Sequence, residues 1–323
     1  METRAGVELG PLTTYRIGGR AQVFAEPRTE ASVVSLLQWA EAEGRRVWIL
    51  GGGSNVLVPD EGLSGVVLRI NRRYGGGDGV SWQDTAARPE AHRDGSVCEL
   101  EVDAGRLLPW LASWCSKQGL CGAQAFYGIP GTVGGATAMN AGALGSSWSD
   151  ITVAVRLADA SGSSWVPTDA IAPAYRTSAL AAAADDTRAR PRVVTRVRLR
   201  LMAAPAEELR ARIAREQKRR TASQPYGLPS AGCVFRNPPG AAAGQLIDAT
   251  GLKGERRGDI AVSNLHANFF VNRGRGTAAD VLSLMLWVRR RVHERYGVLL
   301  EPEIHLLGSL REQWRAETAG RSG

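Results

Sequence analysis

The sequence predicts an α+β fold with two lobes and a separate C-terminal domain. Its 323 residues exceed the length of one typical domain. Short apolar runs of strand length alternate with amphipathic helical patterns, and this alternation restarts after a glycine-rich stretch at residues 73–96. The predicted division is a first lobe over residues 1–73, a second lobe over 74–204, a third domain over 205–310 and a C-terminal tail over 311–323.

Composition and charge narrow the class of protein. Hydrophobic residues make up 44% and charged residues 22%, as in ordinary globular proteins. No apolar run reaches the roughly 18 residues of a membrane span, and the N-terminus resembles no signal sequence, so we expect a cytoplasmic protein. The net charge of +8 could serve nucleic-acid binding. However, the arginine runs at 210–220 and 289–295 follow amphipathic helices without interleaved aromatic residues, which favours solvated helix faces and no nucleic-acid partner.

The cysteines predict neither a disulfide framework nor a metal site. Cys98, Cys115, Cys121 and Cys233 form no CxxC pair, and His266, His293 and His305 have no metal-ligand spacing. We therefore expect no bound metal.

Hydrophobic periodicity gives the expected elements of each part. In the first two lobes they are strands at 21–25, 46–50, 65–70, 98–102 and 193–201, helices at 30–43 and 107–118, and a hairpin joining 151–157 to 164–168. In the third domain they are helices at 206–220 and after Thr277, and strands at 266–271 and 298–307. The apolar face of the last helix is expected to be core rather than an interface, so the predicted state is a monomer.

The first glycine-rich segment follows the predicted strand at 46–50 and reads Gly51-Gly52-Gly53-Ser54-Asn55. Without Cβ atoms, a chain can adopt positive φ and bring several N–H groups close to an anion. The segment lacks both the G-x-G-x-x-G and the G-K-[ST] patterns, so neither Rossmann nor P-loop binding is predicted. Phosphate binding is the functional hypothesis, and a simple tight turn is the alternative.

The second glycine-rich segment covers residues 127–143 in the second lobe. Its small residues allow the backbone to lie against a large flat ligand, and its N–H groups can contact a pyrophosphate. Close packing of a helix on a sheet would explain only a few of these glycines. Two such segments in separate lobes predict one dinucleotide held between them.

Three further segments, at residues 175–176, 233–237 and 301–303, carry side chains that could take part in catalysis or substrate binding. One tight turn brings together the thiol of Cys233, the guanidinium of Arg236 and the amide of Asn237. A thiol has a reference pKa of about 8.5, so Cys233 is mostly protonated at neutral pH and can donate a proton. Each residue also has a simpler interpretation when taken singly: a small buried hydrophobe for Cys233, a surface pair for Tyr175-Arg176 and an edge-strand carboxylate for Glu303.

Taken together, the motifs resemble the UDP-N-acetylenolpyruvoylglucosamine reductases. The matching segments span nearly the whole chain, and seven of them in this order at compatible distances form a specific pattern. They lie at residues 15–19, 50–57, 127–142, 174–176, 232–238, 266–269 and 301–303. The resemblance implies an α+β fold with a two-lobed FAD-binding domain of the vanillyl-alcohol oxidase type and a C-terminal α/β substrate domain.

The resemblance also implies an activity, in which NADPH reduces FAD and the flavin reduces UDP-N-acetylglucosamine enolpyruvate to UDP-N-acetylmuramate for bacterial peptidoglycan synthesis. Arg176 would polarise the enolpyruvyl carboxylate, Cys233 would donate the proton and Glu303 would complete the charge relay. The implied substrate contacts are Tyr175, Arg236 and Asn237. The implied FAD contacts are Tyr15, Ile17, Gly51, Gly52, Gly53, Ser54, Asn55, Gly128, Ile129, Pro130, Gly131, Gly134 and Gly135.

Two positions depart from the family pattern. Cys233 stands where the family usually has a serine proton donor, which leaves a neighbouring water as an alternative donor. Ser223 stands where a basic residue is often found, so that substrate contact has no assigned residue. The short stretch at 224–230 and the lack of an obvious insertion at 174–192 indicate the subgroup without a substrate-covering tyrosine loop.

Two other functions fit parts of the sequence. A flavin-dependent reductase or oxidase of the same superfamily acting on another nucleotide sugar would keep the glycine-rich segments, with Cys121 as the single candidate for a flavin tether. A non-catalytic protein that binds nucleotides or nucleic acid would use the basic helices. Such a binding protein has no reason to keep Arg176, Cys233 and Glu303 together.

Overall fold

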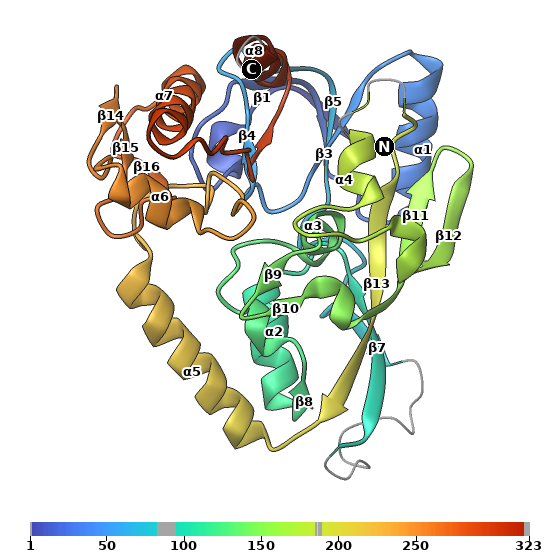
Figure 1. The fold of residues 1–323 in the computed structure, drawn as a ribbon. Helices are drawn as coiled ribbons and strands as arrows, with labels where there is room; N and C mark the ends of the chain where they lie inside the picture. Colours follow the sequence, from blue (N-terminus) through green and yellow to red (C-terminus); the bar gives the residue numbers. More distant parts are fainter. Residues whose placement is uncertain (1, 83–94, 185, 187–188, 320–323) are drawn as a thin grey trace. The chain divides into compact units, whose positions relative to one another are not determined.

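The structure is a computed structural model of the chain, and it describes residues 2–82, 95–184, 186 and 189–319 (Figure 1). The chain forms two compact units. Unit 1 comprises Met1–Arg4, Val23–Gly52 and Gly65–Arg220, and unit 2 comprises Ala5–Gln22, Gly53–Ser64 and Thr221–Gly323. This division differs from the contiguous domains predicted from the sequence. The N-terminal third contributes Tyr15, Ile17 and Leu57 to the apolar core of unit 2, whereas helix α5, Ala206–Ser223, lies almost entirely in unit 1.

The largest sheet of unit 1 is antiparallel and runs in the order β12-β11-β13-β7-β6, with β8 paired to β13 (Figure 1). The predicted hairpin of β11 and β12 is confirmed, with Asp159 opposite Gly162 at the turn. Arg196, Arg198 and Arg200 alternate along β13, the strand predicted at 193–201, and pair with carboxylates of β7. The strands are β6 Val80–Trp82, β7 Val97–Asp103, β8 Leu120–Cys121, β11 Thr152–Asp159, β12 Gly162–Pro167 and β13 Val193–Ala203.

A second sheet has the strand order β1-β2-β5-β3, with β3 and β5 parallel. Its strands are β1 Thr3–Glu8, β2 Arg20–Ala25, β3 Val47–Leu50 and β5 Leu63–Arg69. The sequence predicted the last three but not β1. Helix α1, Glu30–Ala42, begins at Thr29, whose side chain accepts a hydrogen bond from the Ser32 N–H in a capping box.

The core of unit 1 is formed where α1 and α2 bury their apolar faces together with the strands. Leu36 and Leu37 of α1 and Leu111 and Cys115 of α2 are almost fully buried in it. The remaining short elements of this unit are α2 Leu108–Lys117, α3 Val133–Met139, α4 Ala179–Ala184, β9 Gly142–Ala143, β10 Ser146–Ser147 and 3₁₀ turns at Gln124–Phe126, Trp148–Asp150 and Thr168–Ile171.

Unit 2 has a three-stranded antiparallel sheet, β14-β15-β16, with α7 packed beside β14 and β15. The helix predicted after Thr277 is α7, and Thr277 and Asp280 form a capping box at its start. The predicted apolar face of α7 is confirmed as core. The elements are β4 Val56–Leu57, α6 Ala243–Ala249, β14 Arg256–Arg257, β15 Ile260–Val262, β16 Phe270–Asn272, α7 Ala278–Tyr296, β17 His305–Leu306, α8 Ser309–Ala319 and a 3₁₀ turn at Gly10–Leu12.

Three predictions about unit 2 differ from the structure. The strand expected at 298–307 is reduced to β17, and the strand expected at 266–271 begins only at Phe270, because the Phe269 N–H turns back to the His266 carbonyl at 2.9 Å. The segment predicted as a tail from 311 lies mostly in α8, whose Trp314 is buried in the core. No helix in the described part of the chain is long and apolar enough to span a membrane.

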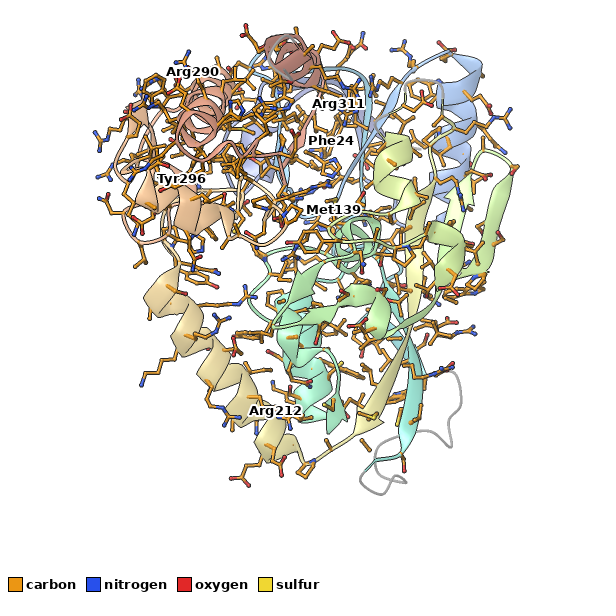
Figure 2. The ribbon with its side chains drawn as sticks, viewed as in Figure 1. Phe24, Met139, Arg212, Arg290, Tyr296 and Arg311 are labelled. Atoms are coloured by element: carbon orange, nitrogen blue, oxygen red, sulfur yellow. The ribbon has the colours of Figure 1, made fainter. Side chains whose placement is uncertain are left out.

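The two arginine runs lie on α5 and α7, from which Arg212 and Arg290 are labelled in Figure 2. The prediction of solvated faces is wrong for Arg289, which is only 7% exposed. Its Nε donates to the Leu300 carbonyl at 3.1 Å, and its guanidinium lies over the Trp314 ring. The guanidinium plane packs on the ring while its N–H groups satisfy a buried carbonyl, so this arginine belongs to the core.

An ion pair ties α1 to the largest sheet of unit 1. Arg156 donates to the Glu30 carboxylate from Nε at 2.6 Å and from Nη2 at 2.7 Å. The hydrogen bond from Arg156 lowers the pKa of Glu30 from 4.5 to about 2. The stabilisation of the folded protein by the Glu30–Arg156 ion pair is therefore fully present above pH 4.5 and is lost as the pH falls towards 2.

We expect Glu30→Gln to lower the free energy of unfolding by about 1 kcal/mol at pH 7, since Arg156 donates two hydrogen bonds to Glu30 but both side chains are partly exposed. Urea denaturation at pH 7 and at acid pH measures the difference between the variant and the parent protein, which should shrink at acid pH. Glu41→Gln is the matched control, because Glu41 and its partner Arg190 are both well exposed. An equal difference at both pH values would contradict the role of the ionised Glu30.

Candidate functional site

The first glycine-rich segment follows β3 directly and is closely packed. A Cβ atom on Gly51 would lie 2.7 Å from Thr132 Oγ1, and one on Gly52 would lie 3.3 Å from Gly131 Cα. Both contacts are within unit 1 and join the two predicted glycine-rich segments. Close packing therefore favours glycine at both positions, and it places this part of the first segment against the second segment.

The same segment has backbone donors to offer a ligand. In the described part of the chain, no residue accepts a hydrogen bond from the backbone N–H groups of Gly52, Gly53, Ser54 and Asn55. Four consecutive donors of this kind suit an anion such as a pyrophosphate. The segment fits the phosphate-binding hypothesis better than the alternative of a simple turn closed by its own hydrogen bonds.

The second segment uses most of its donors internally. The N–H groups of Ile129, Gly131, Val133 and Gly134 bond to backbone carbonyls, and the Gly135 N–H bonds to Thr132 Oγ1. These five N–H groups, which the sequence interpretation assigned to a pyrophosphate, are therefore already bonded within the protein. The segment instead contains the short helix α3, and it presents small residues on a backbone held by these bonds.

Arg220 supports the start of the second segment, a contact that the sequence did not predict. Its Nη1 donates to the Gly128 carbonyl at 2.9 Å. A Cβ atom on Gly128 would lie 2.4 Å from Arg220 Cδ, so the arginine side chain would have to move if this glycine were replaced. The amphipathic pattern of α5 indicated a solvated face and gave no signal for a contact 92 residues away in sequence.

Arg176 lies in unit 1, in a tight turn where the Ala174 and Thr177 backbones bond to each other. Its φ of +56° is unusual for a residue other than glycine. Its Nη1 donates to the Gly142 carbonyl at 2.6 Å. The neighbouring Tyr175 is exposed, with its ring centroid 5.8 Å from the Arg176 guanidinium carbon. Strained, over-determined backbone of this kind is concentrated at functional sites.

Cys233 and Glu303 lie in unit 2 on neighbouring segments. The Glu303 N–H donates to the Val234 carbonyl at 2.8 Å, and the Arg236 N–H donates to the Glu301 carbonyl at 2.9 Å. Both Cys233 and Glu303 are half-buried. Two side chains separated by 70 positions in sequence are thus held on paired backbones, which suits joint action on one ligand.

Asn55 connects the first glycine-rich segment to Glu303 within unit 2. Its Nδ2 donates to the Glu303 carbonyl at 3.1 Å, and its carbonyl accepts from the His305 N–H at 2.9 Å. These bonds continue into the parallel pairing of β4 with β17. The side chain of Asn55 therefore positions the Glu303 backbone, a use that the sequence interpretation of Asn55 as an FAD contact missed.

The predicted substrate contacts Arg236 and Asn237 follow Cys233 directly. Asn237 Oδ1 accepts from the Ala243 N–H at 3.0 Å and so holds the start of α6, while its side chain remains exposed. Burial and the nearby positive charge of Arg236 lower the pKa of His305 to about 4. A neutral imidazole beside Arg236 leaves the guanidinium as the local positive charge, which suits an anionic ligand.

Tyr15 and Ile17 are both buried in the core of unit 2. Among the described residues, the Tyr15 hydroxyl has no hydrogen-bond partner, and burial raises its pKa well above the usual range. A buried hydroxyl without a partner is costly unless a ligand satisfies it. This orphaned donor fits the FAD contact predicted for Tyr15.

Comparison with known proteins gives a consistent result. Residues 21–166 match the family described as FAD binding domain, and residues 224–307 match the family described as UDP-N-acetylenolpyruvoylglucosamine reductase, C-terminal domain. The proteins named UDP-N-acetylenolpyruvoylglucosamine reductase from Anaeromyxobacter sp. (strain K) and Synechococcus sp. (strain CC9311) are 37% and 39% identical over 305 and 309 residues. These alignments cover 94% of this chain and 85% and 92% of those proteins.

A solved structure agrees with these sequence matches. The crystal structure of UDP-N-acetylenolpyruvylglucosamine reductase from Thermus caldophilus is similar to this chain with a TM-score of 0.71 and 34% identity. The similarity covers 95% of this chain and 98% of that one.

Proposed function

Since the chain belongs to the UDP-N-acetylenolpyruvoylglucosamine reductase family and is an FAD-binding oxidoreductase, we propose that it uses NADPH to reduce UDP-N-acetylglucosamine enolpyruvate to UDP-N-acetylmuramate. The observation that carries the proposal is the 37% to 39% identity to reductases of this name, which extends over 94% of the chain. Both the FAD-binding region and the C-terminal region contribute to the similarity. The lobes at 1–73 and 74–204 would hold FAD, and residues 205–310 would hold most of the substrate.

The cofactor contacts follow from the two glycine-rich segments. The N–H groups of residues 52–55 would bind the FAD pyrophosphate, and residues 128–135 would lie along the flavin. Tyr15 would direct its buried hydroxyl to the same cofactor, with Ile17 beside it. When bound, FAD would supply the redox chemistry that links NADPH to the enolpyruvyl double bond of the substrate.

The side chains of the protein would complete the reaction around that transfer. Arg176 would hold the enolpyruvyl carboxylate through two parallel N–H donors and stay charged throughout. As charge builds up on the carboxylate side of the double bond, this guanidinium stabilises it. Cys233 would transfer its Sγ proton to C2, which completes the saturation of the double bond, and solvent would then reprotonate the thiolate.

The remaining predicted residues would bind and orient the substrate. Glu303, whose backbone N–H bonds to the carbonyl of Val234 next to Cys233, would complete the charge relay around the developing enolate. Arg236 and Asn237 would contact the diphosphate, and Tyr175 would cover the sugar. The positive charge of Arg236 beside a neutral His305 supports its assignment to a diphosphate group.

The test separates the two halves of the reaction. The FAD-loaded protein is reduced anaerobically with NADPH, UDP-N-acetylglucosamine enolpyruvate is added, and the return of oxidised-flavin absorbance is followed together with the product. We expect rapid reoxidation and formation of UDP-N-acetylmuramate. Reduction without reoxidation by this substrate would favour a flavin-dependent reductase or oxidase acting on another nucleotide sugar. Failure of NADPH to reduce the flavin would contradict the proposed electron donor.

A further inference from the structure

We propose that Asn140 is a positioning residue that fixes the Arg176 guanidinium through the turn that carries it. The inference rests on the proposed function, in which Arg176 binds the enolpyruvyl carboxylate. Asn140 directly follows α3, whose last residue, Met139, is labelled in Figure 2. Both Asn140 and Arg176 belong to unit 1.

Both ends of the Asn140 carboxamide bond to backbone partners. Its Nδ2 donates to the Ala174 carbonyl at 3.0 Å, and its Oδ1 accepts from the Ser149 N–H at 3.0 Å. Asn140 is only 7% exposed. Because one end of the amide must donate and the other must accept, only one orientation satisfies both contacts. The side chain therefore acts as a fixed brace rather than a mobile surface group.

The turn that it braces needs external support. Arg176 has a φ of +56°, a region that residues with a Cβ atom rarely adopt unless the surroundings hold them there. Within the turn, the Ala174 and Thr177 backbones bond to each other at 3.0 and 3.2 Å. The Ala174 carbonyl thus accepts both the Thr177 N–H and Asn140 Nδ2. Asn140 supplies the support from outside the turn.

The segment that begins with Asn140 also holds the tip of the Arg176 side chain. Arg176 Nη1 donates to the Gly142 carbonyl at 2.6 Å, and a Cβ atom on Gly142 would lie 3.2 Å from that nitrogen. One short segment therefore sets the backbone of Arg176 through Asn140 and its guanidinium through Gly142. Both residues lie in the second glycine-rich segment, so the segment proposed to line the flavin also sets the position of the carboxylate-binding guanidinium.

Asn140→Gly removes the brace with little cost to the backbone, because the φ of +42° at Asn140 is tolerated by glycine. We expect reoxidation of the reduced flavin by UDP-N-acetylglucosamine enolpyruvate to slow by about 10- to 100-fold, since a small misplacement of a positioning group costs about that much. FAD content and reduction by NADPH should be unchanged. Thr168→Val is the matched control: it removes the buried Thr168 Oγ1 bond to the Thr152 carbonyl elsewhere in unit 1 and should leave reoxidation unchanged.

A double-mutant cycle separates positioning from general structural support. If Asn140 acts through Arg176, Asn140→Gly causes no further slowing in an Arg176→Ala background. Equal slowing in both backgrounds would overturn the inference. Asn140→Asp keeps an oxygen for the Ser149 N–H but loses the donor to Ala174, so it should give the same pattern and serves if the glycine variant folds poorly.

The outcomes also distinguish this inference from the proposed function. A normal reoxidation rate in Arg176→Ala would overturn the role proposed for Arg176 itself. A slow Arg176→Ala variant combined with normal Asn140→Gly and Asn140→Asp variants would overturn only the positioning role of Asn140.

Discussion

Replacing Cys233 by alanine should slow reoxidation of the reduced flavin by UDP-N-acetylglucosamine enolpyruvate by about 10²- to 10⁴-fold, the usual contribution of a positioned general acid. Reduction by NADPH should be unchanged, because that step needs no proton at C2 of the substrate. Anaerobic stopped-flow absorbance measures both steps in the same preparation.

The structure explains why the effect should be local to the thiol. Backbone contacts hold the chain on either side of Cys233. Cys233 and Phe269 form an isolated antiparallel β-bridge, and the Val234 N–H donates to the Asn268 carbonyl at 2.8 Å. Asn268 also accepts from the Phe235 N–H and donates to the Phe235 carbonyl. Removing the sulfur therefore leaves the turn in place and removes mainly the proton donor.

Two variants make the interpretation specific. Cys233→Ser places a hydroxyl proton where the thiol proton was. It should recover most of the rate, since serine is the usual proton donor at this position in the reductase family. Cys121→Ala removes a half-buried thiol of unit 1 and should leave both steps unchanged. If Cys233→Ala reoxidises as fast as the parent protein, a neighbouring water is the donor and the proposed role of Cys233 is wrong.

The elements that the sequence predicted well are those with local signals. The hairpin of β11 and β12 has alternating residues on both sides of a tight turn, and α7 has a capping box followed by a regular apolar face. Such signals lie within a few residues of one another, so periodicity alone reveals them.

The elements predicted wrongly depend on distant partners. Residues 298–307 are rich in apolar side chains, yet Pro302 has no N–H to offer a ladder and makes only a bridge with Phe235. The regular pairing of this segment is therefore limited to β17 against β4, a contact between residues about 250 positions apart in sequence. No local pattern near Val298 indicates where its partner lies.

The same limit applies to the candidate site. Glycine density revealed both glycine-rich segments, because close backbone approach requires residues without Cβ atoms. The sequence did not indicate which side chains hold the site in place. These are the amides of Asn55 and Asn140 and the guanidinium of Arg220, and each bonds to a backbone carbonyl far away in sequence. Every residue has a backbone carbonyl, so a side chain that bonds to one does not require a particular residue type as its partner. The partner position therefore carries no recognisable motif.

Replacing Gly53 by alanine should reduce the affinity for FAD by at least about tenfold, which corresponds to about 1.4 kcal/mol. Gly53 has a φ of +65°, and a Cβ atom there would lie 2.2 Å from the Leu12 carbonyl oxygen and 2.9 Å from Thr13 Cα. Both contacts are with backbone, so the loop itself must shift, and the N–H groups of residues 52–55 would shift with it. The flavin-to-protein ratio after purification and titration of the flavin-free protein with FAD measure the effect.

Gly44→Ala is the matched control for this variant. Gly44 has a similar φ of +61°, but an added Cβ atom would have nothing within 4 Å. Both variants carry the cost of a left-handed alanine, about 1–2 kcal/mol, whereas only Gly53→Ala displaces the loop. We therefore expect Gly44→Ala to lower the unfolding temperature without changing FAD affinity. If both variants bind FAD as tightly as the parent protein, the N–H groups of residues 52–55 are not the pyrophosphate site, and the proposed cofactor contacts must lie mainly in the second glycine-rich segment.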